Sequence, residues 1–353
     1  MIALSPAPAA AIDDAIDDAL SRITGRADAL GGAFGELGGA IARAAAGGKR
    51  FRPALVAASF QAFGGTVADA AGLYPVAAAF ELLHTAFVVH DDVIDHDTVR
   101  RGIPNVSGEF RERARSRGAD ASGAALLGDA AAILAGDLLL HEAVRLIALA
   151  DVDPQQRESL LALVDDAVFV SAAGELADVE NAVSAECADS AALLTAAHDK
   201  TAVYSFTAPL AAGAVLAGAS QEAVAALADA ARHLGLAFQL ADDLIGAFGT
   251  SDQAGRDAGG DLREAKRTPL IGLARESGAW SRVNEALSLA YTGPIAVREA
   301  QRVLDESGAR TRLVALVDDA LNEARLTASD PILPAGAEQL VRTIATEIAR
   351  RIP

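Results

Sequence analysis

Two groups of aspartates in the sequence have the spacing of a site for metal ions and phosphate. The first lies in the segment His90–Asp95, in which Asp91 and Asp95 are four residues apart. In a helix this spacing stacks both carboxylates on one face, where their like charges repel unless a cation neutralises them. Mg²⁺ prefers carboxylates, water and phosphate oxygens. The segment therefore predicts a magnesium site for a phosphorylated substrate, with a solvated acidic turn as the alternative.

The second group is the pair Asp242 and Asp243, which follows the mainly apolar run Phe238–Ala241. Two acidic sites that lie far apart in sequence can face each other across the cavity of a helical bundle, and bundles build metal sites in this way. A helix that ends in two solvated aspartates is the alternative. The presence of both groups in one chain favours the metal site.

Basic residues accompany both acidic groups. A chain with a formal net charge of −18 needs such local cations if it is to bind anionic substrates. Guanidinium forks suit phosphate oxygens, and lysine supplies a point charge. Each cation alone is typical of a solvated surface, but together they predict a positive field around the acidic groups. They are Lys49, Arg50, Arg52, Arg100, Arg101, Lys200, Arg256 and Lys266.

The remainder of the chain predicts helices that position these groups. Its 353 residues are 52% hydrophobic and 4% aromatic, and alanine and leucine, which are strong helix formers, supply much of the apolar part. Apolar positions recur at spacings of three and four residues. We therefore predict a single all-α domain over 1–353, with 1–10 as a loose tail and 103–123 as a polar loop. The predicted helices are 11–30, 34–46, 53–63, 67–96, 122–149, 154–181, 189–218, 220–248, 267–278, 281–290, 295–307, 310–326 and 335–351.

Composition also restricts the partners and the location. The acidic net charge disfavours nucleic acid and anionic membrane surfaces as partners. The single cysteine, Cys187, cannot form an internal disulfide, which fits a reducing cytosol. The segment Met1–Ala10 lacks the basic start of a signal peptide. The longest apolar run, Phe206–Ala219, contains Pro209 and is shorter than the roughly 20 residues that span a bilayer. We expect a cytoplasmic protein without a membrane span.

The series of motifs resembles that of trans-type polyprenyl diphosphate synthases, and of geranylgeranyl diphosphate synthases among them. The resemblance implies the isoprenoid synthase fold, a helical bundle around a deep central cavity, and a homodimer. Three positions depart from the family pattern. Gly246 stands where a third aspartate is common, Glu175 replaces a glutamine, and Arg256 replaces a lysine. The matching segments are Gly48–Pro53, Asp91–Asp95, Arg100–Gly102, Gly136–Asp137, Gly174–Asp178, Lys200–Thr201, Phe238–Gln239, Asp242–Asp243 and Asp261–Lys266.

The resemblance also implies a role for each motif residue. Three Mg²⁺ ions would be held against the allylic diphosphate by Asp91, Asp95, Asp178 and Asp242. Two further carboxylates would assist, namely Asp92 and Asp243. The allylic diphosphate itself would be bound by Arg100, Lys200, Arg256 and Lys266. Isopentenyl diphosphate would be bound by Lys49, Arg52, His84 and Arg101. The developing carbocation would lie near Thr201 and Gln239.

The implied activity is Mg²⁺-dependent condensation of isopentenyl diphosphate with an allylic diphosphate to a trans-prenyl diphosphate. Family members set product length by side-chain bulk one turn before the first aspartate, where Phe87 stands beside the small Ala86. This favours a C20 product, geranylgeranyl diphosphate, over C15 farnesyl diphosphate, although Phe87 could equally be a core residue. A class I terpene cyclase would need another metal motif, and a regulatory subunit of a heteromeric synthase tends to lose an aspartate motif. Both are less favoured.

Overall fold

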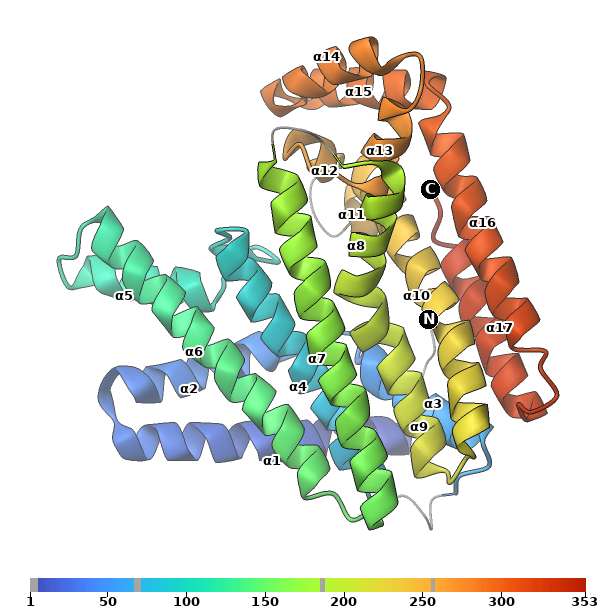
Figure 1. Cartoon of the computed structure of the whole chain (residues 1–353). Helices are drawn as coiled ribbons and strands as arrows, with labels where there is room; N and C mark the ends of the chain where they lie inside the picture. Colours follow the sequence, from blue (N-terminus) through green and yellow to red (C-terminus); the bar gives the residue numbers. More distant parts are fainter. Residues whose placement is uncertain (1–5, 67–70, 185–187, 255–257) are drawn as a thin grey trace. The chain divides into compact units, whose positions relative to one another are not determined.

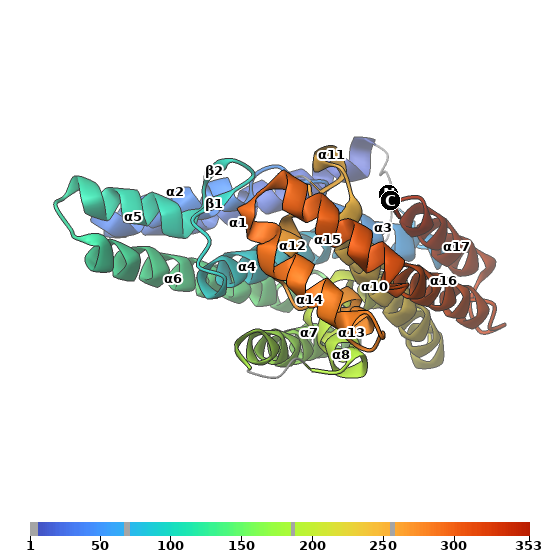
Figure 2. The same ribbon diagram turned by 90° about the horizontal axis from the view of Figure 1, so that it is seen from above.

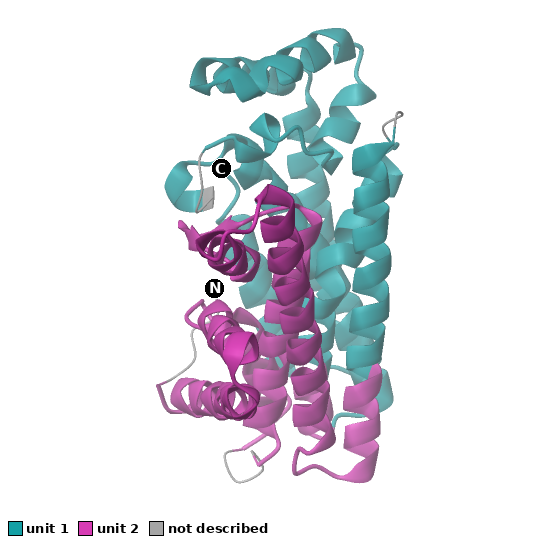
Figure 3. Cartoon of the chain, turned by 90° about the vertical axis from the view of Figure 1, so that its left-hand side faces the viewer, with its two compact units in different colours: residues 1, 163–211, 219–353 teal, residues 2–162, 212–218 magenta. Residues whose placement is uncertain are grey.

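The computed structural model describes residues 6–66, 71–184, 188–254 and 258–353 (Figure 1). Contacts within the chain divide it into two compact units, which Figure 3 shows in different colours. Unit 1 contains residues 163–211 and 219–353, and unit 2 contains residues 2–162 and 212–218. The chain passes from one unit to the other within helices α7 (Pro154–Val183) and α9 (Ala208–Leu216). The single domain over 1–353 stays a prediction, and each unit is described separately.

Unit 2 is built around helix α4 (Leu73–Ile94), on which α1, α3 and α6 pack. Val76, Phe80 and Leu82 of α4 are completely buried. A helix that is apolar on more than one face belongs in the centre of a bundle, and this explains the position of α4. Its C-terminal end carries Asp91 and Asp92. The other helices that lie wholly within this unit are α1 (Pro6–Leu30), α2 (Gly32–Ala45), α3 (Phe51–Ala62), α5 (Val106–Ser116) and α6 (Ala121–Ala148).

A short hairpin follows α4. Strands β1 (Val99–Arg100) and β2 (Ile103–Pro104) pair antiparallel, with Arg100 opposite Ile103. Arg101 and Gly102 form the turn, and their φ angles are +53° and +80°. Two positive φ angles at the centre of a two-residue loop define a type I′ turn, whose twist matches that of the strands. The hairpin therefore turns the two arginines of the Arg100–Gly102 motif back toward α4.

The predicted polar loop over 103–123 is wrong, because this stretch contains β2 and helix α5. Asn105 caps α5 by accepting a hydrogen bond from the backbone N–H of Gly108 at 2.8 Å. The buried residues Val106, Phe110 and Ala114 recur every four residues, which makes one narrow apolar face. The many charged residues between them hide this period in the sequence.

Unit 1 is built around helix α10 (Gln221–Phe248), on which α8, α16 and α17 pack. Leu227, Leu234 and Leu240 are completely buried on α10. Helices α16 and α17 lie side by side in Figures 1 and 2 and are in contact. The other elements of this unit include α8 (Ser190–Ala202), α11 (Ser251–Ala254), α12 (Gly260–Arg263), α13 (Pro269–Arg275), α14 (Trp280–Leu289), α15 (Pro294–Glu306), α16 (Ala309–Thr327) and α17 (Ala335–Ala349).

The predicted single helix over 189–218 is interrupted by a π-helical turn, η2 (Val203–Thr207). Pro209 has no N–H to donate to the carbonyl four residues earlier, so the α-helical pattern fails at this point. The N–H of Ala208 instead donates to Val203 O, five residues back. Lys200 lies in the last turn of α8, directly before this π-helical turn. Turns of this kind are frequent at functional sites.

The all-α prediction is confirmed, since the one hairpin is the whole of the β-structure in the described ranges. Helix α1 begins at Pro6, within the predicted loose tail; residues 1–5 lie outside the described residues. Helices α4 and α6 are long and apolar enough to cross a membrane, by length and composition alone. The apolar window of α4 is 67% buried inside the structure, as in core helices of soluble proteins, whereas that of α6 is 39% buried.

Candidate active site

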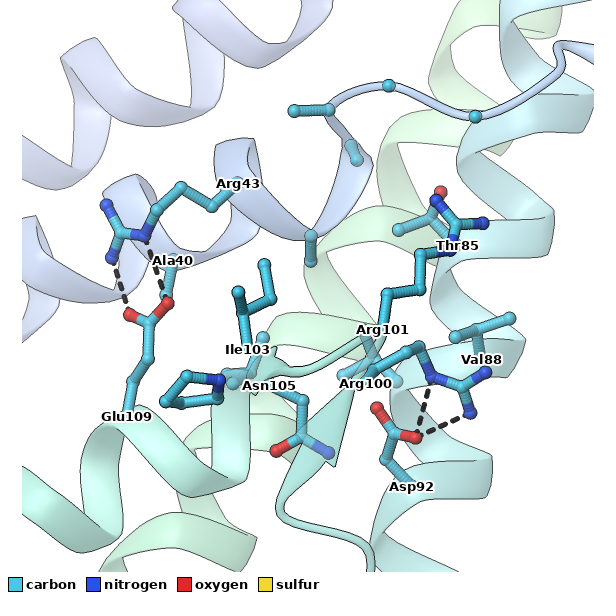
Figure 4. Close-up of a pocket in the computed structure, with 18 of the residues that line it drawn as sticks. Ala40, Arg43, Thr85, Val88, Asp92, Arg100, Arg101, Ile103, Asn105 and Glu109 are labelled. Carbon is cyan, nitrogen blue, oxygen red and sulfur yellow. Dashed lines mark hydrogen bonds and ion pairs between the residues drawn. The ribbon is translucent and has the colours of Figure 1, made fainter. Parts of the chain in front are cut away.

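Unit 2 contains a cavity of about 210 Å³ lined by α2, the end of α4, the hairpin and α5 (Figure 4). The predicted isopentenyl diphosphate residues His84 and Arg101 both line this cavity, together with Arg100. In Figure 4, Arg101 reaches from the hairpin in the direction of Thr85 on α4. Lys49 and Arg52 are not among the lining residues. The structure therefore brings part of the predicted anion site into one cavity.

The cavity has a positive electrostatic field at His84. Burial of the imidazole, followed by the charges of Arg52, Arg100 and Arg101, holds the pKa of His84 well below its ordinary value. The side chain is therefore neutral at pH 7 and can donate one ring N–H. Arg52 thus lies close enough to act on the cavity, although its side chain does not line it. Three guanidinium groups around a neutral imidazole suit a diphosphate.

Arg50 holds the basic loop that precedes α3. It adopts a left-handed backbone conformation with φ +46°. Its Nη1 donates to Ala45 O at 3.1 Å and to Glu81 Oε1 at 3.2 Å, and its Nε donates to Asp13 Oδ1 at 3.0 Å. One cation of the Gly48–Pro53 motif, Arg50, therefore stabilises the loop itself. Lys49 of the same motif is exposed.

The first acidic cluster, Asp91, Asp92 and Asp95, lies at the C-terminal end of α4. Asp92 is buried, and its Oδ1 accepts hydrogen bonds from Arg100 Nε at 2.9 Å and Nη2 at 2.6 Å. Burial raises the pKa of Asp92, and the Arg100 guanidinium opposes that change. Arg100 Nη2 also lies 3.7 Å from Asp91 Oδ2. Arg100, predicted to bind diphosphate, thus also neutralises this cluster.

Helix α6 approaches α4 closely at this cluster. A Cβ on Gly136 would lie 2.1 Å from His90 Nε2, so any larger residue would displace the His90 ring. Asp137 Oδ1 lies 3.6 Å from the same nitrogen, which also lies 3.2 Å from Ile133 O. The Gly136–Asp137 motif therefore fixes the ring that precedes the first acidic cluster.

The second acidic cluster, Asp242 and Asp243, lies near the C-terminal end of α10 in unit 1. Asp243 is 6% exposed, and its Oδ1 accepts a hydrogen bond from Gln239 Nε2 at 3.0 Å. Burial raises the pKa of Asp243 well above its ordinary value, and the charges of Asp261, Asp242 and Asp178 act in the same direction. Asp261 belongs to the closing motif, and its part in this cluster was not predicted.

Lys200 neutralises the carboxylates of α7. Its Nζ lies 3.0 Å from Glu175 Oε2 and 3.0 Å from Asp178 Oδ2. The contact depends on Gly174, because a Cβ there would lie 2.2 Å from the backbone nitrogen of Lys200. Two predicted motifs thus meet, and Glu175, which departs from the family pattern, forms an ion pair here. Thr201, the next residue, is half-buried.

The remaining predicted residues have different outcomes. Arg256 lies outside the described residues. Lys266 is exposed, with its Nζ 3.5 Å from Glu264 Oε2. Sequence reasoning missed Arg351, whose Nη2 donates to Asp242 Oδ1 and whose guanidinium carbon lies 4.3 Å from the centre of the Phe238 ring. No motif signal marks Arg351, because it is 109 residues from Asp242.

The carboxylates fit a hard divalent cation in their chemistry. Asp243 Oδ2 is buried and accepts no hydrogen bond from any residue that the structure describes. Buried carboxylate oxygens require a charged or hydrogen-bonding partner, and Mg²⁺ prefers such oxygens. Within the described ranges, no three His, Cys, Asp or Glu side chains gather closely enough to hold a metal ion. Asp91 and Asp95 belong to unit 2, whereas Asp178 and Asp242 belong to unit 1. Their joint ligation stays a prediction.

Comparison with known proteins agrees with this chemistry. The family model for polyprenyl synthetase matches residues 36–304. The short chain isoprenyl diphosphate synthase of Methanothermobacter thermautotrophicus is 32% identical over 265 residues, covering 75% of this chain and 74% of the relative. The (2E,6E)-farnesyl diphosphate synthase of Mycobacterium tuberculosis is 33% identical over 75% of this chain, but the match spans 63% of that relative's own length.

A solved structure supports the fold. The geranylgeranyl pyrophosphate synthase of Corynebacterium glutamicum, in a complex with isoprenyl diphosphate and magnesium, superposes with a TM-score of 0.86 over 98% of each chain. Its sequence is 24% identical, so this likeness establishes the isoprenoid synthase fold and no more. The family match covers most of the chain and includes both acidic clusters and the basic motifs. We conclude that the chain belongs to the polyprenyl synthetase family.

Proposed function

We propose that this protein condenses isopentenyl diphosphate with an allylic diphosphate to form a trans-prenyl diphosphate. The observation that carries the proposal is the cavity of unit 2, where Arg100 and Arg101 surround the neutral His84 next to Asp92. The guanidinium forks offer charge-assisted hydrogen bonds to a diphosphate. The neighbouring carboxylates offer oxygen ligands to the Mg²⁺ that accompanies a second diphosphate. The proposed metal site at the end of α4 thus lies next to the proposed diphosphate site in the cavity.

The residues of unit 2 would bind the isopentenyl substrate. Arg101 and neutral His84 donate hydrogen bonds to its diphosphate, and Arg52 contributes charge. No nucleophilic side chain is needed, because the isopentenyl double bond supplies the electron pair for the new C–C bond. The proton lost from the product carbon passes to the released diphosphate. Alanine and leucine side chains of the interior exclude water, which would otherwise react with the carbocation.

Allylic C–O cleavage requires cations at the leaving diphosphate. Mg²⁺ held by Asp91, Asp95, Asp178 and Asp242 would neutralise the charge that develops on this group. Arg100 and Lys200 are ion-paired with carboxylates in the structure and would exchange those partners for diphosphate oxygens. Gln239, which donates to Asp243, keeps its amide oxygen for the developing carbocation. Arg256, Lys266 and Thr201 complete the proposed allylic site.

For the product we propose C20 geranylgeranyl diphosphate. Phe87 lies one turn before Asp91 on α4, on the same face, and Ala86 is completely buried beside it. The ring would limit how far the growing chain extends below the cluster. C15 farnesyl diphosphate is the second candidate, because relatives with comparable identity include a farnesyl diphosphate synthase.

Product analysis tests both parts of this proposal. Purified protein is incubated with radiolabelled isopentenyl diphosphate, Mg²⁺ and each allylic primer of 5, 10 or 15 carbons, and the chain length is measured after dephosphorylation. We expect C20 material, with longer products from Phe87→Ala. Phe169→Ala, which removes an exposed ring from α7, is the matched control. An absence of condensation with every primer would contradict the activity, and an unchanged distribution in Phe87→Ala would contradict the role of Phe87.

We further propose a cytoplasmic homodimer that associates through α6. Four large apolar side chains of α6 are exposed, namely Leu126, Ile133, Leu134 and Val144. Because each copy carries a net charge of −18, copies repel unless they meet through an uncharged surface. Sedimentation should show a dimer that Leu134→Glu dissociates and that Leu289→Glu, at an exposed leucine of α14, leaves intact. A monomeric native protein would overturn this proposal.

A further inference from the structure

We propose that Arg351 holds the cation position of the second acidic cluster until a divalent cation displaces it, so that the C-terminal segment sets the metal affinity of this cluster. The inference rests on the proposed function, because it takes Asp242 as a metal ligand. It adds a residue that follows α17, outside the residues 36–304 that match the family model. Arg351 would therefore set the metal affinity of the second acidic cluster from outside the segment that matches the family model.

The contacts of Arg351 are the first observation. Its Nη2 donates to Asp242 Oδ1, and its guanidinium carbon lies 4.3 Å from the centre of the Phe238 ring. Phe238 and Asp242 are four residues apart on α10, so the helix presents the ring and the carboxylate on one face. Helix α17 packs on α10 and brings Arg351 to this face. One guanidinium thus engages both side chains.

The charges around Asp242 are the second observation. The carboxylates of Asp178, Asp242 and Asp261 all raise the pKa of the buried Asp243, so four acids share one region of unit 1. Positive charge stabilises such a group in the absence of metal. Lys200 supplies it at Asp178, and Arg351 supplies it at Asp242. Arg351 therefore stands in for the cation that the same carboxylate would bind.

The exposure of the pair explains how it can exchange. The Arg351 and Asp242 side chains are 27% and 38% exposed, so water screens their attraction and the ion pair is weak. A divalent cation carries twice the charge and binds the same oxygen directly. The stack on Phe238 would keep the displaced guanidinium near the cluster. Its Nη1 is buried and donates to no acceptor in the described part of the chain, so it is available for a diphosphate oxygen.

The neighbouring residue offers a matched control. Arg350 carries the same charge, but its side chain is 71% exposed and it pairs with Glu347 on its own helix. Arg350→Met and Arg351→Met therefore change the net charge equally, and of the two variants Arg351→Met alone removes a contact with the second acidic cluster. A long-range charge effect would be equal in both variants, whereas competition for Asp242 appears only in Arg351→Met.

The test measures binding of Mn²⁺ alone, by the electron paramagnetic resonance signal of the free ion. We expect Arg351→Met to lower the Kd of the competing site about fivefold, the loss of a half-exposed ion pair. Arg350→Met should stay within about twofold, because an exposed distant charge is screened by salt. The Arg351→Met effect should vanish in an Asp242→Asn background. Arg351→Lys keeps the charge without the planar fork and should show an intermediate Kd; it carries the test should Arg351→Met fail to fold.

Equal Kd values for Arg350→Met and Arg351→Met would overturn the inference, as would an Arg351→Met effect that persists with Asp242→Asn. Wild-type protein whose Mn²⁺ binding is insensitive to Asp242→Asn would overturn it as well. The condensation assay separates this result from the proposed function. If Arg351 competes with Mn²⁺ but no condensation occurs, the proposed function is overturned and the inference about Arg351 stands. If condensation occurs but Arg351 does not compete with Mn²⁺, the proposed function stands and the inference is overturned.

Discussion

The two acidic clusters carry the same chemistry, but different parts of the chain neutralise them. Asp92 of the first acidic cluster is bound by Arg100, eight residues later, which the hairpin turns back toward α4. Asp242 of the second acidic cluster is bound by Arg351, 109 residues later, which reaches α10 by the packing of α17. A local turn provides the cation in one case and tertiary packing provides it in the other. Sequence reasoning found the first cation and missed the second for this reason.

The largest expected effect tests whether both clusters serve catalysis equally. Asp91→Asn and Asp242→Asn should each lower kcat about 100-fold or more, because each removes a carboxylate that would hold Mg²⁺ at the leaving diphosphate. Steady-state kinetics with saturating Mg²⁺ would measure this. Asp97→Asn and Asp252→Asn, at exposed acids that follow the two clusters in the sequence, are controls that should keep near-normal rates. Near-normal turnover in either Asp91→Asn or Asp242→Asn would show that the two clusters do not contribute equally to catalysis.

Removal of the local cation should cost stability. Arg100→Gln leaves the buried Asp92 without its ion pair, and we expect a loss of about 2 kcal/mol in the free energy of unfolding at neutral pH. This loss is smaller than that for a fully buried ion pair, because the Arg100 side chain is 41% exposed. Arg101→Gln, at the exposed neighbour in the turn, should leave stability nearly unchanged and raise KM for isopentenyl diphosphate. Denaturant unfolding measures the first effect. Equal stability of the two variants would contradict the local role of Arg100.

Removal of a charge from the second acidic cluster should raise the free energy of unfolding, whereas removal of Arg100 from the first should lower it. Asp243→Asn removes a buried like charge and keeps an oxygen that can accept from Gln239, so we expect the metal-free protein to gain about 1 kcal/mol in stability. The same variant should lose activity, since the carboxylate assists metal binding. Thermal unfolding in the presence of a chelator measures the gain. A clear destabilisation by Asp243→Asn would show that this carboxylate is already satisfied without a metal.

Acid should destabilise the arginine-rich cavity of unit 2. The pKa of His84 is lower in the folded protein than its ordinary value of 6.5, so the folded state binds fewer protons than the unfolded state between these two values. Stability should therefore fall as pH drops below about 6.5. His84→Gln should flatten this fall in denaturant unfolding at a series of pH values. His141→Gln, at an exposed histidine of α6, is the control that should leave the slope unchanged.

The last prediction concerns backbone strain in the segment after Asp261. Ala265 has φ +54°, and backbone hydrogen bonds from Ala265 to Leu262 and from Lys266 to Asp261 form a Schellman motif, in which glycine is usual. Ala265→Gly should therefore stabilise the protein by about 1 kcal/mol. Ala225→Gly, at an exposed position of α10, should instead destabilise it by a similar amount. A loss of stability in both variants would argue against strain at Ala265.

Several parts of the candidate site could be predicted because they are local. The spacing of Asp91 and Asp95 in an apolar segment predicts their shared face, and the apolar period predicts α4 and α10. Helix α5 was missed because its apolar face is one residue wide, and the break after Ala202 was missed although Pro209 marks it. Contacts such as that of Gly136 with His90 join different helices and have no local pattern.

The sequence by itself determined the helical class, the order of the motifs and the charge chemistry of the site, because these depend on residue types at short spacings. Tertiary structure decided which cation meets which carboxylate. Packing buried Asp92 and Asp243, placed Lys200 beside Asp178, and brought Arg351 to Asp242. The free energy of such a contact depends on burial and on neighbours from distant segments, and neither is encoded in the spacing of residues along the chain.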